Sequence, residues 1–179
     1  MFKTMAGALL AVILSGMPAR ADSGVETAGT GIAIALPLIA GGITLCKDDW
    51  KGAAQVTLST ALTVGTALAL KQIVREQRPD HSDFHSFPSD TSALAFAPAQ
   101  FLWQRYGWEY GLPAYGAATF VAWSRVDAQK HHWWDTAASF GISLVWNEIF
   151  TTRYNRYDSW SADLDASPSG ALATLDYRW

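Results

Sequence analysis

The chain has 179 residues, of which 50% are hydrophobic and 16% are charged. That length fits one domain with a sizeable core, and the composition, with nine tryptophans, excludes disordered, collagen-like and disulfide-scaffold chains. A single cysteine, Cys46, cannot form an internal disulfide. The formal net charge of −3 argues against a nucleic-acid partner.

The first 21 residues have the pattern of a secretory signal peptide. Lys3 precedes a charge-free run from Ala6 to Met17, and Ala19-Arg20-Ala21 has the small-x-small form of a signal-peptidase site. The run is shorter than the ~20 apolar residues of a membrane span, so we expect cleavage after Ala21 rather than retention as a first helix. Cleavage would export the chain from a bacterial cytoplasm and leave it more acidic.

Two long charge-free segments open the mature chain. Thr27–Cys46 and Gly52–Leu70 are joined by the polar turn Lys47–Lys51. They predict a helical hairpin of membrane-spanning length. Glycines in the first segment and serines and threonines in the second suit closely packed helices.

Three shorter apolar segments follow the polar loop 79–88. They cover Ser92–Gln104, Gly111–Trp123 and Thr136–Trp146. Each reads as a helix, and their charge-free lengths fit helices that are buried in a bundle or partly immersed in a membrane. The fold class that we predict is therefore all-α, a membrane-associated bundle of about five helices over residues 22–156.

Residues 157–179 form a tail of a different kind. Apolar residues alternate with polar ones on both sides of Pro168-Ser169-Gly170. This period of two predicts a short β-hairpin, with an irregular tail as the alternative. No function follows from it.

Several residues between the apolar segments can carry out chemistry. Lys71, Arg75 and Arg78 are spaced by four and three residues, so a helix continuing from Leu70 to Pro79 would place them on one face. This cationic cluster could bind an anion, although basic residues are also favoured at any helix C-terminus.

Two further groups lie at the starts of later segments. Ser89-Asp90-Thr91-Ser92 leads into an apolar helix, where free backbone amides could hold an anion or simply be capped. His131 and Asp135 open the last segment at i and i+4, after Ser124-Arg125. A carboxylate one turn from an imidazole can accept its N–H and orient the ring.

The order and spacing of these groups resemble a known signature. Lys71-x6-Arg78-Pro79, then Pro88-Ser89, then Ser124-Arg125-x5-His131-x3-Asp135 is similar to the three-part motif of the type-2 phosphatidic acid phosphatase and vanadium haloperoxidase superfamily. The resemblance implies a helical bundle with phosphate chemistry at one end. It implies no metal or other cofactor, and no obligate protein partner is inferred.

The resemblance also implies a role for each matching residue. The histidine matching His131 attacks phosphorus to give a phosphohistidine, and the aspartate matching Asp135 orients it. Lys71, Arg78 and Arg125 match the phosphate clamp, to which Ser89 would add a hydroxyl contact. Positioning and neutralisation of phosphoryl oxygens are what phosphoryl transfer needs most.

The middle motif is a variant. The family usually has Pro-Ser-Gly-His at this place, and the present chain has Ser89-Asp90-Thr91 after Pro88. The missing histidine is the family's proton donor to the leaving group. Asp90 could replace it if its surroundings raise its pKa, and His81, His85 or water are the alternatives.

The resulting prediction is a metal-independent phosphatase that hydrolyses phosphate monoesters or diphosphates, carried by lipids, at the periplasmic side of a bacterial inner membrane. With the mature N-terminus outside, alternating spans bring all three motifs to that side. A soluble periplasmic acid phosphatase of broad specificity is one alternative. A non-catalytic phosphate- or phospholipid-binding module is the other.

Overall fold

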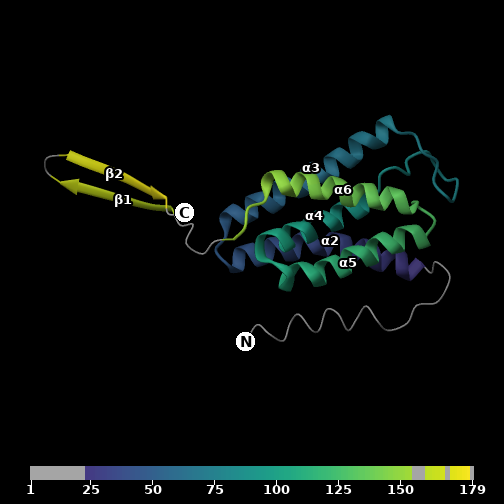
Figure 1. Ribbon diagram of the computed structural model, residues 1–179, viewed down its shortest axis with the longest axis horizontal. Coiled ribbons are helices and arrows are strands. Elements are labelled where there is room, and N and C mark those ends of the chain that lie inside the picture. Colours follow the sequence, from purple (N-terminus) through teal and green to yellow (C-terminus); the bar gives the residue numbers. More distant parts are fainter. Residues whose placement is uncertain (1–22, 155–159, 168–169, 178–179) are drawn as a thin grey trace.

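The computed structural model describes residues 23–154, 160–167 and 170–177. Within these residues, five helices lie side by side along the long axis of a bundle (Figure 1): α2 (Ser23–Cys46), α3 (Trp50–Ile73), α4 (Asp90–Tyr106), α5 (Trp108–Asp127) and α6 (Trp133–Phe150). This confirms the predicted all-α bundle of five helices. The predicted signal peptide, residues 1–21, lies outside the described residues.

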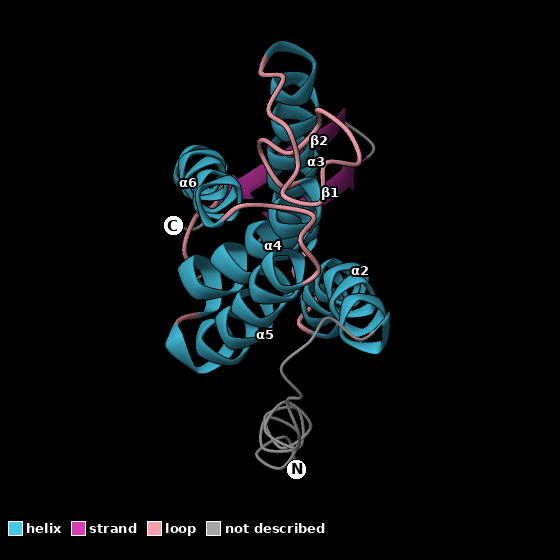
Figure 2. Cartoon of the chain, turned by 90° about the vertical axis from the view of Figure 1, so that its right-hand side faces the viewer, coloured by secondary structure: helices cyan, strands magenta, loops and turns pink. Residues whose placement is uncertain are grey.

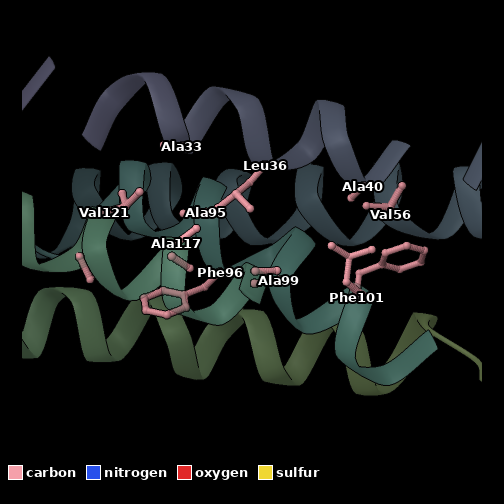
Figure 3. Close-up of a cluster of buried hydrophobic side chains, with 14 residues drawn as sticks. Ala33, Leu36, Ala40, Val56, Ala95, Phe96, Ala99, Phe101, Ala117 and Val121 are labelled. Carbon is pink, nitrogen blue, oxygen red and sulfur yellow. The ribbon is translucent and has the colours of Figure 1, made fainter. Parts of the chain in front are cut away.

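Helix α4 is the centre of the bundle. It packs against each of the other four helices, and Figure 2, which views the bundle from one end, shows them arranged around it. The core is rich in alanine, which lets the helix backbones approach closely. Figure 3 shows this cluster: Ala33, Leu36, Ala40, Val56, Ala95, Phe96, Ala99, Phe101, Ala117 and Val121.

The outer faces of the bundle are also apolar. Helices α2 and α3 are long and apolar enough to cross a membrane, and less than a third of each apolar window is buried inside the bundle. Large side chains such as Leu38, Trp50 and Ile149 are more than half exposed. These faces fit the predicted association with a membrane.

One predicted helix boundary is wrong. Helix α3 ends at Ile73, and Val74 is already extended, so Arg75 and Arg78 do not share a helix face with Lys71. The segment after α3 instead folds back on itself and contacts the turn before α6, where the N–H of Asp80 donates to the carbonyl of Gln129 at 3.1 Å. The backbone N–H of Arg78 donates to the carbonyl of Asp83, and local helix propensity is too weak to outweigh such contacts.

The C-terminal segment forms two strands. β1 (Trp160–Ser167) and β2 (Gly170–Tyr177) pair antiparallel with Trp160 opposite Tyr177, as the alternating pattern predicts. Residues 168–169 lie outside the described residues. Within the described ranges the strands contact only each other.

A buried ion pair closes the end of the bundle where α2 meets α3. Asp49 caps α3 by accepting the N–H of Gly52 at 2.8 Å, and it also accepts hydrogen bonds from the Arg105 guanidinium and the Tyr106 hydroxyl. A Cβ atom at position 52 would lie 2.1 Å from an Asp49 oxygen, so only glycine fits there. Both charged side chains are only 4% exposed.

We expect Asp49→Asn to destabilise the bundle by about 3–5 kcal/mol, because it leaves the Arg105 charge buried without its partner. Asp48→Asn is the matched control: Asp48 is exposed and has a φ of 52°, which asparagine tolerates. Unfolding followed by circular dichroism in detergent measures both. Equal stability of the two variants would contradict this account.

The same carboxylate predicts how stability depends on pH. Burial alone would raise the pKa of Asp49, but Arg105, Tyr106 and the Gly52 amide outweigh burial and hold the pKa below its ordinary value of 3.8. A lowered pKa gives stability that is complete above pH ~4 and is lost as the pH falls through the folded-state pKa. The stability of Asp49→Asn should therefore change less than that of wild type when the pH is lowered from 5 to 2.

Candidate active site

A polar cavity of about 350 Å³ lies at the other end of the bundle. It is at the right-hand end in Figure 1, where α3 and α5 end and α2, α4 and α6 begin. The lining side chains are mostly charged: Glu26, Lys71, Arg78, Ser82, Asp83, Asp90, Thr91, Arg125, Lys130 and His131. Five of the predicted site residues thus share one cavity, although they lie as far as 60 positions apart in the sequence.

His131 is fixed by the backbone of the loop before α4. Its side chain is buried, and Nδ1 lies 2.7 Å from the carbonyl oxygen of Ser86. A carbonyl oxygen can only accept, so Nδ1 carries a hydrogen, and in the neutral ring Nε2 then keeps its lone pair. Nε2 has no hydrogen-bond partner within the described part of the chain. The ring is therefore held in the tautomer that a nucleophile needs.

Asp135 lies beside the imidazole of His131, on the side of Nδ1. It is fully buried, and its Oδ2 accepts the Ser86 hydroxyl at 2.5 Å and the His132 backbone N–H at 2.8 Å. The same oxygen is 3.4 Å from His131 Nδ1. Burial would raise the pKa of Asp135, but His131, Ser86 and His132 outweigh it and lower the pKa. An ionised carboxylate thus lies beside the imidazole.

The predicted geometry of the His131 and Asp135 pair is wrong in one respect. Helix α6 begins at Trp133 with His132 as its N-cap, so His131 lies before the helix and the two side chains do not share a helical face. Asp135 still lies beside His131, because its carboxylate turns back toward the N-cap residue His132, as a capping-box side chain does. The hydrogen bond of Nδ1 goes to the Ser86 carbonyl at 2.7 Å, while Asp135 Oδ2 lies 3.4 Å from the same nitrogen.

Asp90 is the first residue of α4 and lies in the cavity. It forms an ion pair with Lys71 Nζ. Burial would raise the pKa of Asp90, but the hydrogen bond and charge of Lys71 outweigh burial and lower it. A proton donor needs the opposite shift. His81 and His85 are exposed and do not line the cavity.

Three of the four predicted phosphate-binding residues line the cavity, and the fourth does not. Lys71 and Arg125 are 6% and 5% exposed and line the cavity. Arg78 also lines it, and its side chain donates to Asp83 at 2.8 Å and to the Lys130 carbonyl at 3.1 Å. Ser89 does not: it caps α4, and its hydroxyl is bonded to Ser92.

Sequence reasoning missed four residues that line the cavity: Glu26, Ser82, Asp83 and Lys130. Thr91, which was considered only as part of a possible anion-binding helix start, also lines it. Lys130 is a neighbour of a motif residue and could have been suggested by that position alone. Glu26 has no such signal, because it lies on α2, far in sequence from every motif. Arg75 shows the reverse case, since it is exposed and outside the cavity lining.

One group of side chains has the composition of a metal site. Ligand atoms of Glu76, His132 and Asp135 lie within 4.8 Å of one another. Asp135 Oδ2 is already engaged by Ser86 and His132, and the His132 ring is stacked on Trp134 at a centroid distance of 4.3 Å. None of these three residues lines the cavity.

Residues 52–158 match the family model described as the PAP2 superfamily. The chain belongs to the PAP2 superfamily. The matched region contains all the residues of the three-part signature, and it confirms the predicted phosphatase. Helix α2 lies outside the match.

The PAP2 assignment agrees with one curated relative. The chain is 26% identical over 162 residues to a protein named lipid A 4'-phosphatase of Helicobacter pylori (strain J99 / ATCC 700824), and the alignment covers 80% of each chain. No solved structure matches the chain.

We expect Ser86→Ala to lower kcat about tenfold with little change in KM, because Asp135 loses one hydrogen bond to its charged oxygen while the Ser86 carbonyl still holds His131. Ser143→Ala is the matched control, since Ser143 is buried on α6 and its hydroxyl bonds only within that helix. Steady-state kinetics measure both variants. A Ser86→Ala enzyme as active as wild type would show that Asp135 does not need this contact.

Proposed function

We propose that this PAP2 phosphatase hydrolyses phosphate monoesters or diphosphates carried by lipids, through a phosphohistidine at His131, on the periplasmic face of a bacterial inner membrane. The observation that carries the proposal is the 2.7 Å contact between His131 Nδ1 and the Ser86 carbonyl, at the wall of a cavity with four cations. A phosphate-binding module would need the cations but not a nucleophile of fixed tautomer.

The chemistry follows from these positions. The lone pair of His131 Nε2 attacks phosphorus, the P–N bond forms, and the bond to the leaving oxygen breaks with its electron pair going to that oxygen, which takes its proton from water. Water then attacks phosphorus, the P–N bond breaks, and free imidazole is regenerated with inorganic phosphate. Asp135 offsets the positive charge of the substituted ring, while Lys71 and the two arginines neutralise the phosphoryl oxygens.

A lipid substrate is supported by the surface around the cavity. Trp133 and Trp134, at the start of α6, are more than half exposed at the cavity end, and Trp50 and Trp108 are exposed at the opposite end. Tryptophans at both ends of apolar helices are typical of the two membrane interfaces. A helix of 24 residues such as α3 is about 36 Å long, enough to cross the hydrocarbon core. The name of the curated relative agrees with a lipid phosphate.

We expect His131→Ala to abolish phosphate release, with wild-type activity persisting in excess chelator, because the nucleophile is a side chain and the proposed chemistry uses no metal. His85→Ala, which alters an exposed histidine outside the cavity, should retain activity. Phosphate release from a diphosphate lipid and from phosphatidic acid measures all three proteins. Chelator-sensitive activity, or an active His131→Ala, would refute the mechanism.

We expect the rate of hydrolysis to depend strongly on the pKa of the leaving group. The carboxylate of Asp90 is held ionised by Lys71, so the leaving oxygen receives little help from a protein acid. Diphosphates and aryl phosphates should therefore be cleaved faster than alkyl monoesters, and the rate should fall steeply as the pKa of the leaving group rises. A series of aryl phosphates measures the slope, and a flat series would show that an acid operates after all.

A further inference from the structure

The cavity holds carboxylates as well as cations, which is unexpected where phosphate binds. Each cation of the cavity is paired with one acidic side chain: Lys71 with Asp90, Arg78 with Asp83 at 2.8 Å, Arg125 with Glu26 at 3.5 Å, and Lys130 with Asp80 at 2.6 Å. Without a bound anion, such pairs offset the charge of the two buried cations, Lys71 and Arg125. Once phosphate occupies the cavity, the same carboxylates repel it.

The net charge of the lining determines how strongly the carboxylates oppose the binding of phosphate. Four cations face three carboxylates, so the lining has a formal excess of one positive charge. A phosphate dianion brings more negative charge than this excess can neutralise. The carboxylates thus weaken the binding of inorganic phosphate, which is the product that must leave last.

Glu26 contacts a buried arginine, Arg125, through both its backbone carbonyl and its carboxylate. Its backbone carbonyl accepts a hydrogen bond from Arg125 Nη2, and its Oε1 lies 3.5 Å from Nη1 of the same guanidinium. Within the described residues, the two terminal nitrogens of Arg125 have no other hydrogen-bond partner. Arg125 is 5% exposed, so Glu26 holds it at the cavity wall.

The packing of α2 explains how Glu26 reaches this position. Gly29 lies one turn further along α2, and a Cβ atom there would lie 2.0 Å from Ser124 Oγ and 3.3 Å from Arg125 Nη2. Only glycine allows α2 to approach the end of α5 so closely. This contact brings a residue from outside the matched PAP2 region into the active site.

We propose that Glu26 is a positioning residue with two effects on the phosphatase: it holds Arg125 in place while the cavity is empty, and it lowers the affinity for phosphate so that the product leaves. This inference rests on the proposed function, since it assumes that phosphate occupies this cavity. It assigns α2 a part in turnover as well as in packing.

The test is product inhibition of the full-length enzyme in detergent. Glu26→Gln keeps the backbone contact and the size of the side chain but removes its charge, so we expect the inhibition constant of inorganic phosphate to fall roughly three- to tenfold after allowing for solvent screening. KM should fall with it, and kcat should not rise. Glu26→Asp restores the charge and should behave nearly as wild type.

Glu148→Gln is the control, because it removes the same charge at the far end of α6 and should leave phosphate inhibition unchanged. Unchanged or weaker phosphate inhibition in Glu26→Gln would overturn the inference. If Glu26→Gln does not fold, Glu26→Ala gives the same test. A wild type that neither releases nor binds phosphate would refute the proposed function itself, whereas normal wild-type inhibition with an unaltered Glu26→Gln refutes only the role of Glu26.

Discussion

The hydrogen bond from His131 Nδ1 to the Ser86 carbonyl is the contact on which the rest of the site depends. It joins the loop before α4 to the turn before α6, two segments 45 positions apart, and it determines which imidazole nitrogen is free. Ser86 contributes twice, because its hydroxyl also holds Asp135. The loop after α3 therefore holds His131 in place as well as carrying Arg78.

The middle of the bundle is apolar and its two ends are charged. Its middle is built of alanine-rich contacts around α4, and its outer faces are apolar (Figures 1 and 2). Charged side chains gather at the two ends, where one end closes on the Asp49 and Arg105 pair and the other opens into the cavity. This distribution suits a protein that crosses a membrane and acts on phosphates at one surface.

The sequence predicted the helices and the signature residues, because long apolar runs and fixed spacings are local signals. It could not predict that the Ser86 carbonyl accepts the hydrogen bond of His131, since every residue has a backbone carbonyl and no side-chain pattern marks the one that is used. The end of α3 at Ile73 depends on contacts of the following loop with the turn before α6, such as the hydrogen bond from the Asp80 N–H to the Gln129 carbonyl. The Ser89 hydroxyl takes the simple capping role that the sequence left open beside anion binding. Glu26 was missed because only the fold brings α2 beside Arg125.

The proposed mechanism requires His131 to be the nucleophile. Rapid mixing of wild-type enzyme with a diphosphate lipid, followed by an alkaline quench and peptide mass spectrometry, tests it most directly, since a phosphoramidate survives alkali. The account predicts one added phosphoryl group on the peptide that contains His131 and none in Asp135→Asn, whose turnover is impaired before the intermediate accumulates. A phosphoryl group on another residue, or turnover without any covalent intermediate, would contradict it.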